Sequence, residues 1–192
     1  YFQQYLLEGP LAQSMGVENH ISRNVVASII GSEQPGQFII LGAHYDGQGH
    51  GGTISLNVDT ADSLHNSADD NASGVAGLMH LAGELTEEAL SKSVLFVAFS
   101  GEELGLLGSR YYADKLQISP DSILAMINFD MIGRLTDEEL TIFGTGTSPQ
   151  WEELLSKSEN PGLFIRTNAS GTGASDHSSF HDVGIPVLHY FT

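Results

Sequence analysis

The sequence predicts an α/β fold, a three-layer sandwich in which a mostly parallel mixed β-sheet is covered by helices on both faces. Strand-like and helix-like segments alternate along most of the chain, which is the pattern of such folds. Several strand-like segments are apolar throughout, as expected for strands that are buried on both faces of a sheet. The 192 residues are enough for one domain with a substantial hydrophobic core and too few for two.

The first part of the chain is predicted to contain a helix and a hairpin. Apolar residues recur with helical spacing in residues 1–15, which predicts an amphipathic helix that is interrupted near Gly9 and Pro10. Residues 24–30 and 37–43 are rich in β-branched side chains, and the sequence SEQPG between them is a good turn signal. We therefore expect these two runs to pair as a β-hairpin.

The middle and end of the chain are predicted to alternate between helices and buried strands. Residues 46–70 form a polar, glycine-rich stretch of the length that functional loops have. Residues 73–89 should form a helix, because Val75, Leu78 and Leu85 recur on one face. The other predicted elements are helices over 104–116 and 149–158 and strands over 93–99, 123–129, 140–143, 163–166 and 185–190.

The charge balance excludes some classes of partner. There are 7 basic and 24 acidic residues, and the net charge of −17 would repel nucleic acid and anionic lipid. No apolar run approaches the roughly 20 residues that a membrane-spanning helix needs, so we expect no membrane insertion. Cysteine is absent, so any transition metal must be held by histidine and carboxylate groups. The first residue is Tyr1 rather than Met, and we expect a secreted or periplasmic protein. The oligomeric state is left open.

Metal-binding side chains follow four of the apolar strands. They are His44 and Asp46, Glu102 and Glu103, Asp130, and His189, with Asp70 just ahead of the helix predicted over 73–89. Each has a simpler explanation when taken alone, because Asp70 and Asp130 could cap a helix or a turn and the two glutamates could begin a helix. These explanations do not account for the convergence of the side chains, which are expected at one edge of the sheet because the ends of parallel strands meet there. Carboxylates gathered in one cleft repel each other unless a cation compensates them.

The charges favour two divalent ions. Two zinc ions carry one more positive charge than two neutral histidines and three carboxylates offset, so a bridging hydroxide would close the balance. That hydroxide is also the nucleophile that hydrolysis needs. Histidine and carboxylate ligands suit a catalytic zinc site with an open position, although manganese or cobalt would be tolerated by the same groups. Two Zn²⁺ ions per chain are therefore expected.

Five motifs resemble those of a known family. The segments GAHYD, DDNASG, FSGEELGLLGS, INFDMIG and IPVLHYFT follow one another from about Asn24 to the last residue. In this order they resemble the M28 family of zinc aminopeptidases, which have a co-catalytic two-metal site. The resemblance implies a metal-dependent exopeptidase that acts on peptide substrates and hydrolyses the N-terminal peptide bond.

The resemblance also implies a role for each site residue. By similarity His44 would bind one metal and His189 the other, Asp70 would bridge them, and Glu103 and Asp130 would complete the two shells. Glu102 matches the general base that activates the bridging hydroxide, and Asp46 matches the acid that orients the His44 ring.

Parts of the family pattern do not transfer. Relatives place a tyrosine that stabilises the oxyanion at positions held here by Leu188 and Thr172, so we leave that donor unassigned. Asp176 and His177 either border the substrate pocket or lie at the start of a helix. Family members usually continue past the last ligand, so residues 1–192 are expected to form a single zinc peptidase catalytic domain that lacks the family's C-terminal segment.

Three other functions stay open. The same fold could act on a different substrate, as carboxypeptidase-like or glutaminyl-cyclase-like relatives do, although the cyclases typically use one metal. The chain could instead be a non-catalytic binding module that kept the peptidase fold, but such modules lose ligands and none is missing here. A calcium-binding acidic domain would leave His44 and His189 without a purpose.

Overall fold

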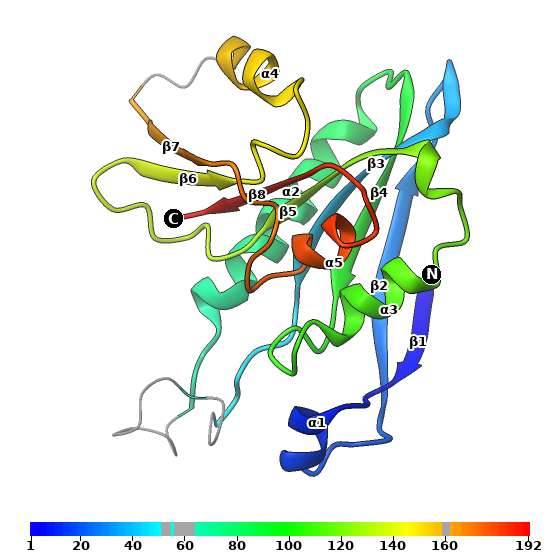
Figure 1. Cartoon of the computed structure of the whole chain (residues 1–192), viewed down its shortest axis with the longest axis vertical. Helices are drawn as coiled ribbons and strands as arrows, with labels where there is room; N and C mark the ends of the chain where they lie inside the picture. Colours follow the sequence, from blue (N-terminus) through cyan, green and yellow to red (C-terminus); the bar gives the residue numbers. More distant parts are fainter. Residues whose placement is uncertain (51–54, 56–63, 159–161) are drawn as a thin grey trace.

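The computed structural model describes residues 1–50, 55, 64–158 and 162–192, which form one mixed sheet with helices packed against it (Figure 1). The strands within this part of the chain are β1 (Phe2–Leu6), β2 (Ile21–Ile29), β3 (Gln34–His44), β4 (Lys92–Phe99), β5 (Ile123–Phe129), β6 (Glu139–Phe143), β7 (Phe164–Asn168) and β8 (Val187–Phe191). Their order across the sheet is β1-β2-β4-β3-β5-β8-β6-β7. The four central strands, β4, β3, β5 and β8, are parallel to one another.

Helices pack on both faces of this sheet. They are α1 (Pro10–Ser14), a π-helical turn (Ala68–Ser73), α2 (Gly74–Thr86), α3 (Leu107–Asp114), a 3-10 turn (Pro120–Ser122), α4 (Trp151–Lys157) and α5 (His177–His181). On one face, Leu78 of α2 packs against Leu41 and Phe96 of the central strands. On the opposite face, Tyr112 of α3 and Phe180 of α5 pack in one cluster with Ile40 and Val97. These two strand residues are the chain neighbours of Leu41 and Phe96, and successive side chains of a strand point to opposite faces. The predicted α/β sandwich with a mixed sheet is confirmed.

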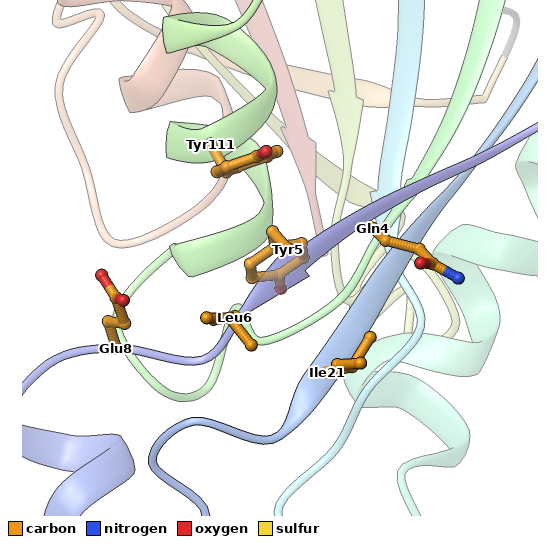
Figure 2. Close-up of a pocket in the computed structure, with 6 residues that line it drawn as sticks. All are labelled: Gln4, Tyr5, Leu6, Glu8, Ile21 and Tyr111. Carbon is orange, nitrogen blue, oxygen red and sulfur yellow. The ribbon is translucent and has the colours of Figure 1, made fainter.

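The first six residues are a strand, so the helix predicted over residues 1–15 is wrong for its first half. β1 pairs antiparallel with β2, and only Pro10–Ser14 is helical. The ring of Tyr5 stacks on that of Tyr111 in α3, with 5.2 Å between the ring centroids. Both residues line a pocket between β1 and α3 (Figure 2). The Tyr5 hydroxyl donates to the Ser100 carbonyl at 2.6 Å, which ties β1 to the end of β4.

The predicted hairpin is also wrong, because β4 lies between β2 and β3. The chain does reverse its direction between β2 and β3, but it crosses the start of β4, so the two strands are not neighbours. The N–H of Ser32 donates to the Leu90 carbonyl and that of Gln34 to the Ser91 carbonyl, both at 2.8 Å. A Cβ on Gly31 would lie 2.4 Å from the carbonyl carbon of Lys92, so glycine permits this close crossing.

The elements predicted after residue 70 are confirmed with small shifts in their ends. Helix 73–89 corresponds to α2, helix 104–116 to the shorter α3, and helix 149–158 to α4. Strands 93–99, 123–129, 140–143, 163–166 and 185–190 correspond to β4, β5, β6, β7 and β8. Of the long loop predicted over residues 46–70, residues 51–54 and 56–63 lie outside the described residues.

Candidate metal centre

The carboxyl ends of the four central strands bring the predicted site residues to one edge of the sheet. His44 is the last residue of β3, Asp130 directly follows β5, and His189 lies within β8. The parallel pairing of β5 with β8 puts Asn128 beside His189. A cavity of about 550 Å³ opens at this edge, and five of the predicted residues line it: Asp70, Glu102, Glu103, Asp130 and His189. This is where ligand sites form in open α/β sheets.

His44 is buried at the centre of this group. Its Nε2 lies 3.2 Å from Oδ1 of Asp70 and 3.3 Å from Oδ1 of Asp130. On the other side of the ring, Nδ1 donates to the Asp46 carbonyl at 3.2 Å. This hydrogen bond leaves Nε2 as the nitrogen that faces the carboxylates, as a metal-binding imidazole requires.

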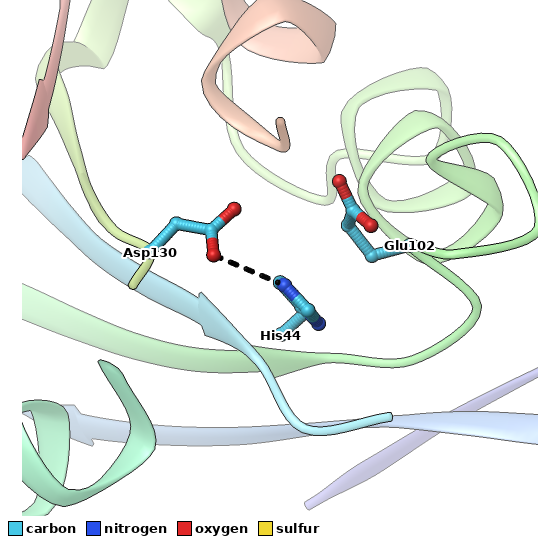
Figure 3. A group of neighbouring side chains, drawn as sticks. All are labelled: His44, Glu102 and Asp130. Carbon is cyan, nitrogen blue, oxygen red and sulfur yellow. Dashed lines mark hydrogen bonds and ion pairs between the residues drawn. The ribbon is translucent and has the colours of Figure 1, made fainter. Parts of the chain in front are cut away.

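Glu102 approaches the same point from the end of β4 (Figure 3). One ligand atom from each of His44, Glu102 and Asp130 lies within 4.8 Å of the others. This group contains Glu102, for which the role of general base was predicted, and does not contain Glu103. Glu103 lines the cavity, and its buried Oε1 accepts no hydrogen bond within the described residues.

Asp46 joins the loop after β3 to the loop after β4. Its carboxylate accepts hydrogen bonds from the backbone N–H groups of Glu102 at 3.1 Å and Glu103 at 3.3 Å. One of the same oxygens lies 3.7 Å from Nδ1 of His44. A single side chain therefore positions the backbone of both glutamates and faces the histidine ring.

Asn71 fixes the segment that carries Asp70. This side chain is 1% exposed, and its amide donates to the Phe129 carbonyl at 2.9 Å. Its carbonyl oxygen accepts from the backbone N–H groups of Gly74 at 2.9 Å and Met131 at 3.2 Å. The start of α2 is thereby tied to the end of β5, which holds Asp70 beside the strand end that carries Asp130.

A chain of polar contacts links His189 to Asp130. The amide nitrogen of Asn128 lies 3.2 Å from Nδ1 of His189 and donates to the Ser175 hydroxyl at 2.8 Å. Ser175 in turn donates to Oδ2 of Asp130 at 2.6 Å. The His177 ring stacks on His189 with 4.4 Å between centroids and an angle of 4°. Both histidines line the cavity.

Burial shifts the pKa values of several groups in the site when no cation is bound. It raises the pKa of Glu102 to about 9, and it raises the pKa of Glu103 and that of Asp176 to about 7. Burial likewise lowers the pKa of His189 to about 4. For His44, burial acts to lower the pKa, but the hydrogen bonds to surrounding carboxylates outweigh it and the pKa rises.

These groups fit a divalent cation. The site supplies nitrogen and oxygen donors without thiolate, and such donors bind zinc in many catalytic sites. The unpartnered Oε1 of Glu103 and the crowded acids around His44 are what a bound cation would compensate. Residues that line the cavity in the described part of the chain include neither lysine nor arginine, so no side-chain ammonium or guanidinium takes this role there.

Some residues of the site carry no signal in the sequence. Asn71, Asn128 and Ser175 were not predicted, although each contacts a predicted ligand or holds its backbone. For Asp176 and His177, both the pocket border and the start of a helix were left open, and His177 has both properties, because it lines the cavity and begins α5. Asp176 directly precedes α5 and does not cap it with a side-chain hydrogen bond.

Comparison with known proteins identifies the family. The family model described as Peptidase family M28 matches residues 24–192 of this chain. The chain belongs to peptidase family M28. The resemblance found in the five sequence motifs is thus confirmed.

This M28 chain is similar to curated proteins and to solved structures. It is 32% identical over 186 residues to leucine aminopeptidase 2 of Trichophyton equinum, covering 91% of this chain and 34% of that protein. BSAP, a zinc aminopeptidase from Bacillus subtilis, matches with a TM-score of 0.70 and 27% identity over 90% of this chain and 40% of that one. A glutaminyl cyclase from Porphyromonas gingivalis matches with a TM-score of 0.72 and 19% identity over 98% and 68%, which shows a shared fold.

The M28 chain spans about a quarter to a third of the length of these curated relatives, from 24% to 34%. Among the described helices, none is long and apolar enough to cross a membrane.

Proposed function

We propose that this M28 chain is the catalytic domain of a zinc-dependent aminopeptidase, which removes the N-terminal residue of peptides with two zinc ions. One observation carries the proposal: at the sheet edge of this M28 chain, Nε2 of His44 lies within 3.3 Å of a carboxylate oxygen of Asp70 and of Asp130. The names of the relatives, leucine aminopeptidase 2 and BSAP, support the same activity. A secreted or periplasmic location stays a prediction.

The ligands follow from the family resemblance. His44 would hold one ion and His189 the other, with Asp70 shared between them and Glu103 and Asp130 completing the two sets. All but His44 line the cavity, and His44 contacts Asp70 and Asp130 directly. Zinc bound by these groups would polarise the peptide carbonyl and lower the pKa of the attacking water.

Glu102 is the general base in this proposal. Its carboxylate accepts a proton from the attacking water and passes it to the nitrogen of the leaving amine. Its backbone is held by the hydrogen bond to Asp46, and its side chain lies in the cavity beside His44 and Asp130. Asp46 acts as a positioning residue, since it holds both glutamates and faces the His44 ring.

The cavity lining favours the N-terminus of a peptide over its C-terminus. In the described part of the chain, the residues that line the cavity include neither lysine nor arginine. A C-terminal carboxylate beside the cleaved bond would need an ammonium or guanidinium partner, which this lining does not supply. The lining therefore supports an aminopeptidase over the carboxypeptidase-like alternative.

Substitution of the base tests the proposal. Glu102→Gln should leave zinc bound but lower the turnover of leucine anilide at least about a hundredfold, because general base catalysis is lost. Glu152→Gln removes a carboxylate on the exposed face of α4 and is the matched control. Retained activity in Glu102→Gln would overturn the assignment of the base.

Two further measurements separate the alternatives. One assay follows the cyclisation of peptides that begin with glutamine, and another follows the release of the C-terminal residue from peptides. Both are run beside the hydrolysis of the anilide. Cyclisation or C-terminal release without anilide hydrolysis would favour the other substrate classes. Purified protein that contains no zinc and gains no stability on zinc addition would favour a binding module.

A further inference from the structure

The cavity has an apolar wall on each side of its ionisable groups. Leu11, Gly105 and Leu106 form one wall next to the end of β4, and Met131, Phe143 and Phe191 form the other next to the ends of β5, β6 and β8, which the sheet order places beyond β3. The first wall is continuous with Glu102, because the N–H of Leu106 donates to the Glu102 carbonyl at 2.8 Å. The second wall adjoins His189, whose ring lies 5.4 Å from that of Phe143. A peptide lying across the site would therefore meet a different wall on each side of the cleaved bond.

Leu11 comes from a segment outside the match to the M28 family. That match begins at residue 24, whereas Leu11 belongs to α1 in the loop over residues 7–20. Two backbone hydrogen bonds between Leu7 and the pair Asn19 and His20 close this loop, at 2.8 and 2.9 Å. Ala12, the next residue of α1, is fully buried and anchors the helix.

Leu11 is 40% exposed and lines the cavity beside Gly105, two residues after Glu103. A Cβ on Gly105 would lie 4.0 Å from Cδ1 of Leu11, which is ordinary van der Waals contact. Apolar surface with this degree of exposure beside a cavity is available to a ligand.

We propose that Leu11 is a specificity-determining residue that contacts the side chain directly after the cleaved bond. The inference rests on the proposed function, in which Glu102 gives a proton to the leaving amine. The residue that carries this amine must lie on the side of Glu102, where Leu11 and Leu106 form the wall. The wall beside His189 then receives the N-terminal side chain. Large apolar residues should be preferred after the cleaved bond.

Substrates that differ only in their second residue test this inference in the full-length protein. Leu11→Ala should lower kcat/KM for leucyl-phenylalanine amide about tenfold, because apolar pocket contact is lost. The same variant should change kcat/KM for leucyl-glycine amide less than about twofold, because glycine has no side chain to reach the wall.

A charged variant gives a readout that a structural role would not produce. Leu11→Asp should shift the preference from leucyl-phenylalanine amide toward leucyl-lysine amide, because a carboxylate replaces apolar surface beside the second residue. The matched controls are Leu154→Ala and Leu154→Asp, at a position that is 52% exposed on α4 and lies outside the cavity lining. They should leave both preferences unchanged.

Each outcome decides the inference. Equal losses with the glycine and phenylalanine substrates in Leu11→Ala, or a changed preference for the first residue, would overturn it. Absence of hydrolysis by the wild-type protein would refute the proposed function alone. In that case, calorimetry measures the affinity of the zinc-loaded protein for the two amides and tests the contact with Leu11. Leu11→Ala must weaken the binding of leucyl-phenylalanine amide and leave that of leucyl-glycine amide unchanged.

Discussion

Asn71 connects the segment that carries Asp70 to the end of β5, and its removal should be costly. Asn71→Ala leaves the Phe129 carbonyl and the N–H groups of Gly74 and Met131 without their partner in a buried place. The free energy of unfolding should fall by about 2–4 kcal/mol, as expected when buried polar groups lose hydrogen bonds. Urea denaturation measures this loss.

The matched control for this change is Asn66→Ala. Asn66 is exposed, and it accepts one hydrogen bond from the Ala68 N–H at 3.0 Å. Its loss should cost less than about 0.5 kcal/mol, in line with surface substitutions. Equal costs for the two variants would contradict the role that we assign to Asn71.

Asp46 should matter for zinc affinity without being a ligand. Asp46→Asn removes the charge that faces the His44 ring and exchanges a carboxylate oxygen for an N–H donor beside the N–H groups of Glu102 or Glu103. Zinc affinity should fall about 10- to 100-fold, as for other residues that orient a metal ligand. Competition with a chelator measures the dissociation constant.

Asp114→Asn is the control for this charge change, because Asp114 is an exposed residue at the end of α3. Unchanged zinc affinity in Asp46→Asn, or an equal loss in both variants, would contradict a positioning role for Asp46.

The sequence predicted the residues that follow strands but not those that connect them. His44 and Asp130 stand directly at the ends of apolar runs, so the rule for parallel sheets places them together. Ser175 joins the site through hydrogen bonds to Asn128 and Asp130, across 47 and 45 positions of the chain. No local pattern marks such a residue, because the contact exists only after the sheet and α5 have packed.

At the level of elements, α5 should contribute to stability through its aromatic residue. Phe180 is 0% exposed, and its ring lies 5.8 Å from that of Phe99 and 6.1 Å from that of Tyr112. Phe180→Ala should lower the free energy of unfolding by about 3–5 kcal/mol, because a large cavity is left in the core. Denaturant titration provides the measurement.

Phe164→Ala serves as the matched change, since Phe164 is 64% exposed on β7. Its effect on the free energy of unfolding should stay below about 1 kcal/mol. A similar loss in both variants would mean that α5 does not anchor this face of the sheet.

Two elements near the N-terminus show where sequence patterns are ambiguous. The spacing of Phe2, Tyr5 and Leu6 fits a helix, but in β1 only Tyr5 is buried while the other two are exposed. The partner strand β2 begins fifteen positions after Leu6, beyond the range of a periodicity argument. Similarly, a turn signal between β2 and β3 predicts a reversal but cannot reveal that β4 will occupy the place between them.

For the whole molecule, the fold concentrates negative charge that folding alone does not compensate. The net charge is −17, and four acids line one cavity where the central strands end: Asp70, Glu102, Glu103 and Asp130. Burial raises the pKa of Glu102 to about 9 and that of Glu103 to about 7. Gathering these acids in one cavity costs free energy in the absence of a cation. Zinc binding should therefore stabilise the native state of the whole domain and not only complete its site.

Zinc addition should raise the melting temperature of the metal-free protein. At a free zinc concentration of about 100 times the dissociation constant, linkage supplies about 2.7 kcal/mol. For a domain of this size each kcal/mol shifts Tm by about 2–4 °C, so the expected rise is about 5–10 °C. Differential scanning calorimetry with and without zinc measures it. The double variant His44→Ala with His189→Ala should show no such rise, and an equal rise there would place the stabilising ions elsewhere on the acidic surface.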